Sequence, residues 1–179
     1  MEDFTITQTF ERGDMRTPNT DVAFMFQKSL FLKKNEHLCQ QKKMKDMENT
    51  SIINGRRIAS DRIAELGENE IFVFGSNIHG AHGGGAARYA HQKFGAEWGV
   101  GEGLTGRTYA LPTMEGDASL KQAVEHFIAC AKAHPEFTFL VTAVGCGIAG
   151  YTPDEVAPLF REAASLENVY LPLVFWEVL

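Results

Sequence analysis

Four short apolar stretches in the later part of the chain have the length and composition of buried strands. They are Ile71–Phe74, Thr108–Leu111, Thr138–Val144 and Val169–Val174. Apolar runs of four to eight residues, bounded by glycine, proline or polar residues, are typical of strands covered on both faces. The pattern therefore predicts an internal sheet.

Helical periodicity fills the gaps between these stretches. Ala86–Phe94 predicts a helix that Gly95 ends, and apolar residues between Leu120 and Ala131 recur three and four positions apart. Ser119 with Gln122 forms a possible capping box at the start of the second helix. Thr152 before Pro153 predicts the start of a third, with Thr152 as N-cap and proline at the first position. Strands that alternate with helices indicate an α/β domain with a largely parallel sheet.

The first fifty residues differ from the rest. Of the 17 glycines only Gly13 precedes residue 51, and residues 1–50 show no sustained period. We interpret residues 1–50 as an N-terminal extension that is either disordered or loosely docked, and residues 51–179 as the domain. An alternative is that Met47 is the biological start of the protein.

Composition narrows the class of protein. The chain has 179 residues and a net charge of −6, and the whole excess of acidic residues falls in residues 51–179. Such a domain is a poor general binder of nucleic acid, because phosphate contacts need clustered Lys and Arg. No run of about 18 apolar residues predicts a membrane span, and no secretory signal is evident. Three separated cysteines argue against a disulfide framework, so we expect a cytoplasmic protein.

Two glycine-rich loops follow predicted strands and lead into predicted helices. The first runs from Gly75 to Gly85 and includes Ser76, Asn77, His79, His82 and the triplet Gly83, Gly84 and Gly85. Glycines at a helix N-terminus leave backbone amides open to an anion such as phosphate. The alternative is a flexible loop whose glycines only allow tight turns.

The second loop is Gly145, Cys146, Gly147, Ile148, Ala149, Gly150 and Tyr151. In open α/β sheets ligands bind beyond the carboxyl ends of the strands, so both loops are expected to face one cleft. Tyr151 either stacks on a ribose or base or packs on the helix start. Between the loops, Gly99–Arg107 is either a mobile flap or a surface excursion, and Arg107 is a weaker candidate for a phosphate contact.

At these residues the chain resembles the macro domains, which bind ADP-ribose and in some branches hydrolyse ADP-ribosyl bonds. The resemblance rests on Phe72–Asn77, on Gly83–Gly85 and on Gly147–Pro153, and covers about residues 52–175. It implies a three-layer α/β/α domain with a mixed, largely parallel sheet.

The resemblance also implies roles for the loop residues. Asn77 would contact the distal ribose, Gly83–Gly85 the diphosphate, and Gly145–Tyr151 the diphosphate from the other side. Asp61 would hold the adenine amino group, although it also suits the first turn of a helix. The implied partner is a small ADP-ribose-like ligand or an ADP-ribosylated macromolecule, and no metal or cofactor is expected.

Departures from the family leave the reaction open. Ala86 and Ala87 stand where hydrolytic members often carry an aspartate, so the family's usual catalytic acids are missing. His82 and His79 are the local candidates for acid–base work, with backbone-bonded loop histidines as the alternative. Cys146 is a candidate nucleophile or simply a small loop residue. A second hypothesis is therefore a hydrolase or transferase that acts on another nucleotide-linked or phosphorylated metabolite.

Overall fold

A computed structural model of the protein describes residues 49–179, which all belong to one compact unit, Gln41–Leu179. The expected N-terminal extension lies outside the described residues, except for its last two, and so does the alternative start at Met47. The first strand begins at Thr50, and Asn49 before it is already buried. The folded unit thus includes at least the two residues that precede the expected boundary at Ser51.

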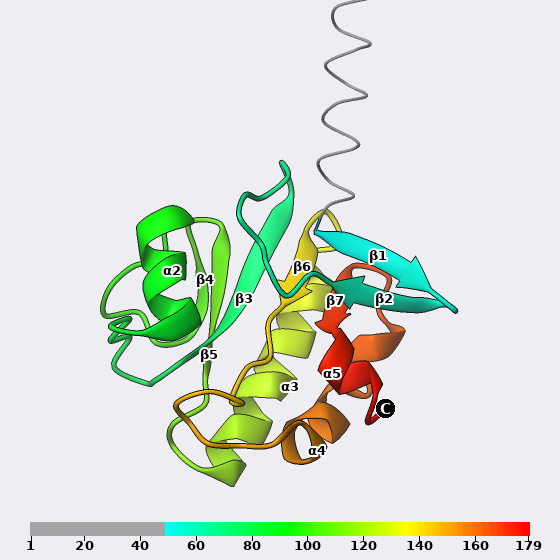
Figure 1. The fold of residues 1–179 in the computed structure, drawn as a ribbon. Helices are drawn as coiled ribbons and strands as arrows, with labels where there is room; N and C mark the ends of the chain where they lie inside the picture. The colour runs from blue at the N-terminus through cyan, green and yellow to red at the C-terminus, as the bar shows by residue number, and fades with distance from the viewer. Residues whose placement is uncertain (1–48) are drawn as a thin grey trace, which may run out of the picture. The chain divides into compact units, whose positions relative to one another are not determined.

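Within these residues seven strands form one mixed sheet, in the order β1-β2-β7-β6-β3-β5-β4 (Figure 1). The pairs between β2, β7, β6, β3 and β5 are parallel, and the two outer pairs are antiparallel. The α/β class with a largely parallel sheet is confirmed. The strands are β1 (Thr50–Ile53), β2 (Arg56–Ala59), β3 (Glu70–Ser76), β4 (Gly103–Thr105), β5 (Thr108–Pro112), β6 (Thr138–Val141) and β7 (Val169–Pro172).

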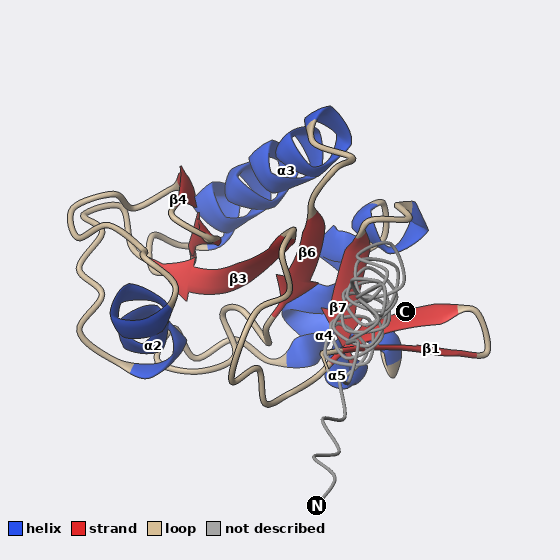
Figure 2. Cartoon of the chain, turned by 90° about the horizontal axis from the view of Figure 1, so that it is seen from above, coloured by secondary structure: helices blue, strands red, loops and turns tan. Residues whose placement is uncertain are grey.

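Strand β3 lies inside the sheet, between β6 and β5, and is apolar on both faces. Ile71 and Val73 pack into one buried cluster with helix α3 (Asp117–Ala133), whereas Phe72 and Phe74 pack into another with helix α2 (Gly85–Lys93). Successive side chains of a strand point to opposite faces, and Figure 2 shows the two helices on either side of β3. Each face of the sheet thus has its own core.

The remaining helical segments are short. They are α4 (Pro153–Val156), the 3-10 turns η1 (Ala157–Phe160) and η2 (Ala163–Ser165), and α5 (Leu173–Trp176). The expected cap at Thr152 is confirmed, because Thr152 and Glu155 form a capping box. No helix within residues 49–179 is both long enough and apolar enough to cross a membrane.

Several element boundaries differ from the predicted ones. The capping box expected at Ser119 is wrong, because α3 already begins at Asp117, after Gly116 with a φ of 90°. The third predicted strand ends at Val141, where the chain leaves the sheet to form the second glycine loop. The last strand ends at Pro172, and the residues after it turn into α5, which buries Phe175 completely.

The segment interpreted as a flap is tied to the domain. Its residues Gly103–Thr105 form β4, which pairs antiparallel with β5. The Arg107 guanidinium donates a hydrogen bond to the carbonyl of Gly67 and does not line either of the cavities described below, so the phosphate contact considered for Arg107 gains no support.

Candidate functional site

Three adjacent parallel strands, β6, β3 and β5, end at the same edge of the sheet and bring three loops together. The loop after β3 is the first glycine loop, the loop after β6 contains the second, and the loop after β5 is Thr113–Gly116. Ligands of α/β sheets bind at such an edge, beyond the carboxyl ends of the strands.

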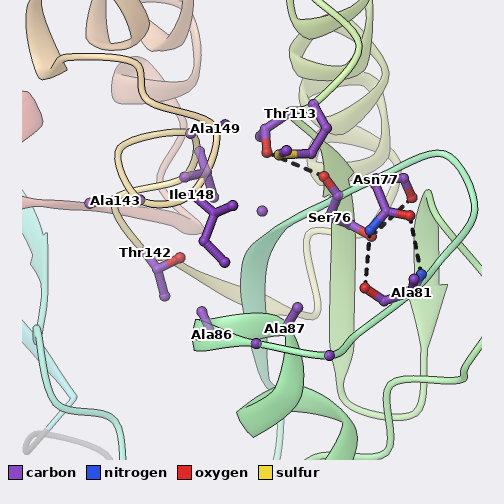
Figure 3. A pocket seen from close by; sticks show the side chains of 18 of the residues that line it. Ser76, Asn77, Ala81, Ala86, Ala87, Thr113, Thr142, Ala143, Ile148 and Ala149 are labelled. Atoms are coloured by element: carbon purple, nitrogen blue, oxygen red, sulfur yellow. Dashed lines mark hydrogen bonds between the residues drawn. The ribbon is translucent and has the colours of Figure 1, made fainter.

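The loops enclose an open cavity of about 570 Å³, in the size range of small-molecule sites. Figure 3 shows Ser76 and Asn77 on one side of it, Ile148 and Ala149 on the other, and Ala86 and Ala87 at its floor. Its lining consists of Gly75, Ser76, Asn77, His79, Ala81, Gly83, Gly84, Gly85, Ala86, Ala87, Thr113, Met114, Glu115, Thr142, Ala143, Val144, Gly145, Gly147, Ile148 and Ala149.

Asn77 fixes the shape of the first loop. Its Oδ1 accepts hydrogen bonds from the backbone N–H groups of His79 (3.1 Å) and Ala81 (3.2 Å), and its Nδ2 donates to the Ala81 carbonyl (3.0 Å) (Figure 3). An amide nitrogen carries two hydrogens, so Nδ2 keeps one for a ligand. Asn77 is therefore a loop-forming residue that also lines the cavity.

The N-terminus of α2 opens into this cavity without a side-chain cap. Gly84 is the N-cap residue, its φ of −147° is extended, and the first turn holds no acidic residue. The first intrahelical bond runs from Arg88 N–H to the Gly84 carbonyl, so the N–H groups of Gly85, Ala86 and Ala87 have no partner in the helix. These amides and the positive end of the helix dipole favour an anion.

The second loop reaches across to the first. Gly145 and Gly150 have φ of 78° and 83°, which glycine adopts without strain. The Ile148 side chain is 80% exposed, yet its Cδ1 lies 3.4 Å from the point where a Cβ on Gly84 would stand. The two glycine loops thus approach each other at Gly84 and Ile148, above the open helix end.

A second cavity of about 450 Å³ adjoins the first. The two share the lining residues Gly85, Ala86 and Thr142. The second is lined in addition by Asp61, Arg62, Ile63, Ala64, Phe72 and Tyr89. Asp61 therefore lines a cavity next to the one at the N-terminus of α2, and its expected contact with an adenine stays a prediction.

In the first cavity the structure adds three polar lining residues that the sequence interpretation did not single out, namely Thr113, Glu115 and Thr142. The Glu115 carboxylate accepts hydrogen bonds from the backbone N–H groups of Ile78 (2.7 Å) and Met114 (3.1 Å). The signal that could have found it is its position, because residues 113–116 follow a buried strand in the same way as the glycine loops do.

Four of the expected site residues do not line either cavity. They are His82, Cys146, Gly150 and Tyr151. The Tyr151 hydroxyl donates to the Asp117 carboxylate (3.0 Å), and this hydrogen bond is the main cause of a raised pKa of Tyr151. Cys146 packs against the core, and burial raises the pKa of its thiol, which disfavours a nucleophilic thiolate.

His82 lies behind the first loop. It is 1% exposed, its Nε2 is 3.0 Å from the Glu97 carbonyl, and its ring packs edge-on against Phe74 and Trp98. Burial lowers the pKa of His82, with the Glu97 carbonyl acting against that shift and His91 adding to it. His79, by contrast, is exposed and lines the first cavity.

No group of three or more His, Cys, Asp or Glu side chains in residues 49–179 is arranged to hold a metal ion. The polar groups of the cavities are backbone amides, the side chains of Asn, Ser, Thr, Tyr and His residues, two carboxylates and, in the second cavity, Arg62. Comparison with protein-family models, with curated proteins and with solved structures found no match to this chain, so its function has to be inferred from the chemistry of the site itself.

Proposed function

We propose that the protein binds ADP-ribose or a closely related adenine nucleotide with a sugar beyond its diphosphate, on a macro-like α/β/α fold. The observation that carries the proposal is the pair of neighbouring cavities, which share three lining residues, with the uncapped N-terminus of α2 where they meet. A ligand with an anionic middle and two uncharged ends fits this arrangement, with its middle at the N-terminus of α2 and one end in each cavity.

The diphosphate belongs at the junction, where amides of the first turn of α2 converge. The N–H groups of Ile148 and Ala149 have no hydrogen-bond partner within the described residues and supply donors from the opposite loop. No Lys or Arg of the described part of the chain lines the first cavity, so backbone amides and the helix end supply its positive potential.

The adenine belongs in the second cavity. Asp61 offers a carboxylate that can accept from an exocyclic amino group, and Ile63, Phe72 and Tyr89 provide apolar and aromatic surface. The distal ribose then lies in the first cavity beside Asn77 and Glu115. The macro-like assignment is supported by the helices on both faces of the sheet and by the positions of the two glycine loops.

The alternative hydrolase or transferase hypothesis depended on His82 or Cys146. Neither side chain lines a cavity, so no observation favours a reaction through them. Binding is accordingly the function proposed here.

Thermal unfolding of the full chain with ADP-ribose, AMP or phosphate tests the proposal. A ligand at a hundredfold its dissociation constant stabilises by about 2.7 kcal/mol, which for a chain of this size raises Tm by roughly 5–10 °C. We expect such a rise with ADP-ribose and little with equal concentrations of AMP or phosphate.

The variant that locates the ligand is Gly84→Glu. The backbone of Gly84 suits any residue, and an added Cβ meets only the flexible end of Ile148, so the variant should fold. Its carboxylate would occupy the anion site, and we expect the Tm rise with ADP-ribose to disappear. Gln92→Glu, which adds the same charge on the exposed side of α2, is the control and should keep the rise. If ADP-ribose raises the Tm of Gly84→Glu as much as that of the unaltered protein, the ligand does not bind at this junction.

A further inference from the structure

The first cavity has a negatively charged end. Among residues 49–179, Glu115 is the only carboxylate in its lining, and no Lys or Arg of that range lines the cavity to neutralise it. Its two hydrogen bonds to backbone N–H groups, at Ile78 and Met114, come from two different loops and hold the carboxylate in place.

The Glu115 carboxylate can still accept from a ligand. Each of its oxygens accepts one of the two backbone bonds, and a carboxylate oxygen has two lone pairs. One acceptor site on each oxygen is therefore open to a hydroxyl donor in the cavity. Sugar hydroxyls on adjacent carbons match two such acceptors on one carboxylate.

The neighbourhood of Glu115 is acidic as well. Asp117 begins α3 and Glu155 lies in the first turn of α4, and both act with Glu115 on the Tyr151 hydroxyl to raise its pKa. Of these three carboxylates, Glu115 lines the first cavity, whereas the open amides of α2 lie where the two cavities share lining residues. Negative charge and amide donors thus belong to different parts of the site.

We propose that Glu115 determines which ligands the site accepts: those whose far end is a neutral, hydroxyl-bearing sugar, and not those that end in a further phosphate. This inference rests on the proposed function, since it takes the diphosphate to lie at the N-terminus of α2. It goes beyond that function because it assigns the choice between a neutral and an anionic far end to one side chain.

The test is a titration calorimetry series on the full chain with three ligands. They are ADP-ribose, ADP-ribose with a phosphate on the distal ribose, and ADP, which lacks the distal ribose. Like charges a few ångströms apart near a protein surface weaken binding by about tenfold or more at physiological salt. We expect the phosphorylated ligand to bind at least tenfold more weakly than ADP-ribose to the unaltered protein.

Two variants distinguish the effect of the Glu115 charge from the effect of its side-chain size. Glu115→Gln keeps the side-chain size and should reduce the discrimination to about threefold or less, with a weaker affinity for ADP-ribose because a neutral amide is a poorer acceptor. Glu115→Lys should reverse the order and favour the phosphorylated ligand, a gain that misfolding cannot produce. Glu125→Gln, which removes one charge from an exposed position of α3 outside both cavities, should leave all three affinities unchanged.

The outcomes are distinct. If the unaltered protein binds ADP-ribose but does not discriminate, if Glu115→Gln keeps the full discrimination, or if Glu115→Lys keeps the original order, the role of Glu115 is refuted and the proposed function stands. If none of the three ligands binds, both proposals fall. ADP affinity serves as an internal check, because Glu115→Gln should leave it within about twofold if the anion site is intact.

Discussion

His82 is a buried histidine held in its neutral form. Its Nδ1 has no hydrogen-bond partner within residues 49–179, and burial lowers its pKa below the ordinary value of 6.5. The unfolded chain therefore binds this proton more tightly than the folded one. The stability that neutral His82 contributes is complete above pH 6.5 and is lost as the pH falls towards the folded pKa.

We accordingly expect acid to destabilise the protein partly through this one ring. In urea unfolding from pH 8 to pH 5, His82 adds a slope of at most about 1.4 kcal/mol per pH unit below pH 6.5. His82→Phe should lower stability by about 1 kcal/mol at pH 8, through loss of the bond to Glu97, and should flatten that slope. His126→Gln changes an exposed histidine and serves as the control. Parallel pH curves for the protein and His82→Phe would contradict the assignment.

At single positions the sequence predicted best those lining residues whose role depends on backbone conformation. The glycines and Asn77 have recognisable spacing, and most of them line the cavity. The direction in which a side chain points could not be predicted from the sequence in the same way. His82 and Cys146 belong to the same loops as the lining residues but point into packed interiors, and Glu115 lies in a loop without glycine repeats. Those directions depend on long-range contacts that no local pattern encodes.

Among the elements, the loop after β3 and the segment before β4 are joined backbone to backbone. A Cβ on Gly80 would stand 2.3 Å from Val100 N, and one on Gly101 would stand 2.4 Å from the Asn77 carbonyl oxygen. The Gly99 N–H also donates to the Gly80 carbonyl (3.0 Å). The segment before β4 therefore packs directly against the backbone of the first glycine loop and fixes the position of Asn77.

Gly80→Ala should break this support. Both Gly80 and Gly99 have positive φ, 61° and 92°, but only Gly80 is in close contact. Gly99→Ala should cost about 1–2 kcal/mol of stability from backbone strain alone. Gly80→Ala should cost at least about 2 kcal/mol more, because backbone must move, and should also weaken ADP-ribose binding. Equal losses of Tm and affinity in the two variants would show that the contact has no structural role.

Elements with strong local signals were predicted and those defined by pairing were not. Thr152 and Glu155 cap α4 as expected, because the cap is a contact within four residues. The hairpin of β1 and β2 had a local signal, Asn54-Gly55, which favours a two-residue turn, but its strands are largely exposed and lack a buried apolar run. Strand β4 is only three residues long and exists through its pairing with β5.

At the scale of the whole domain, Asn49 connects the start of β1 to Glu70, the first residue of β3. Its Nδ2 donates to the Glu65 carbonyl and to the Glu70 carboxylate, both at 2.7 Å, and the Gly67 N–H donates to the same carboxylate oxygen (2.7 Å). Glu70 is only 5% exposed. A buried carboxylate that loses a donor is costly, by about 1.5–3 kcal/mol.

Two shortened chains test this boundary. Residues 49–179 contain the seven described strands and the lining of both cavities, so we expect a chain that begins at Met47 to fold and to bind ADP-ribose as the full chain does. A chain that begins at Ser51 loses Asn49 and should be less stable by about 2 kcal/mol or more. Asn49→Ala in the longer fragment should reproduce most of that loss. If the chain from Ser51 is as stable as the chain from Met47, Asn49 is not part of the folded unit.

The proposed anion site, built from backbone amides, also has a consequence for how a ligand arrives. Amide dipoles act over short distances, whereas the protein carries a net charge of −6 that extends further into solution. A diphosphate ligand approaches against that field until it reaches the N-terminus of α2, so encounter is slowed rather than steered. Dissolved salt screens the repulsion, and association should therefore become faster as ionic strength rises, the reverse of what sites lined by Lys and Arg show.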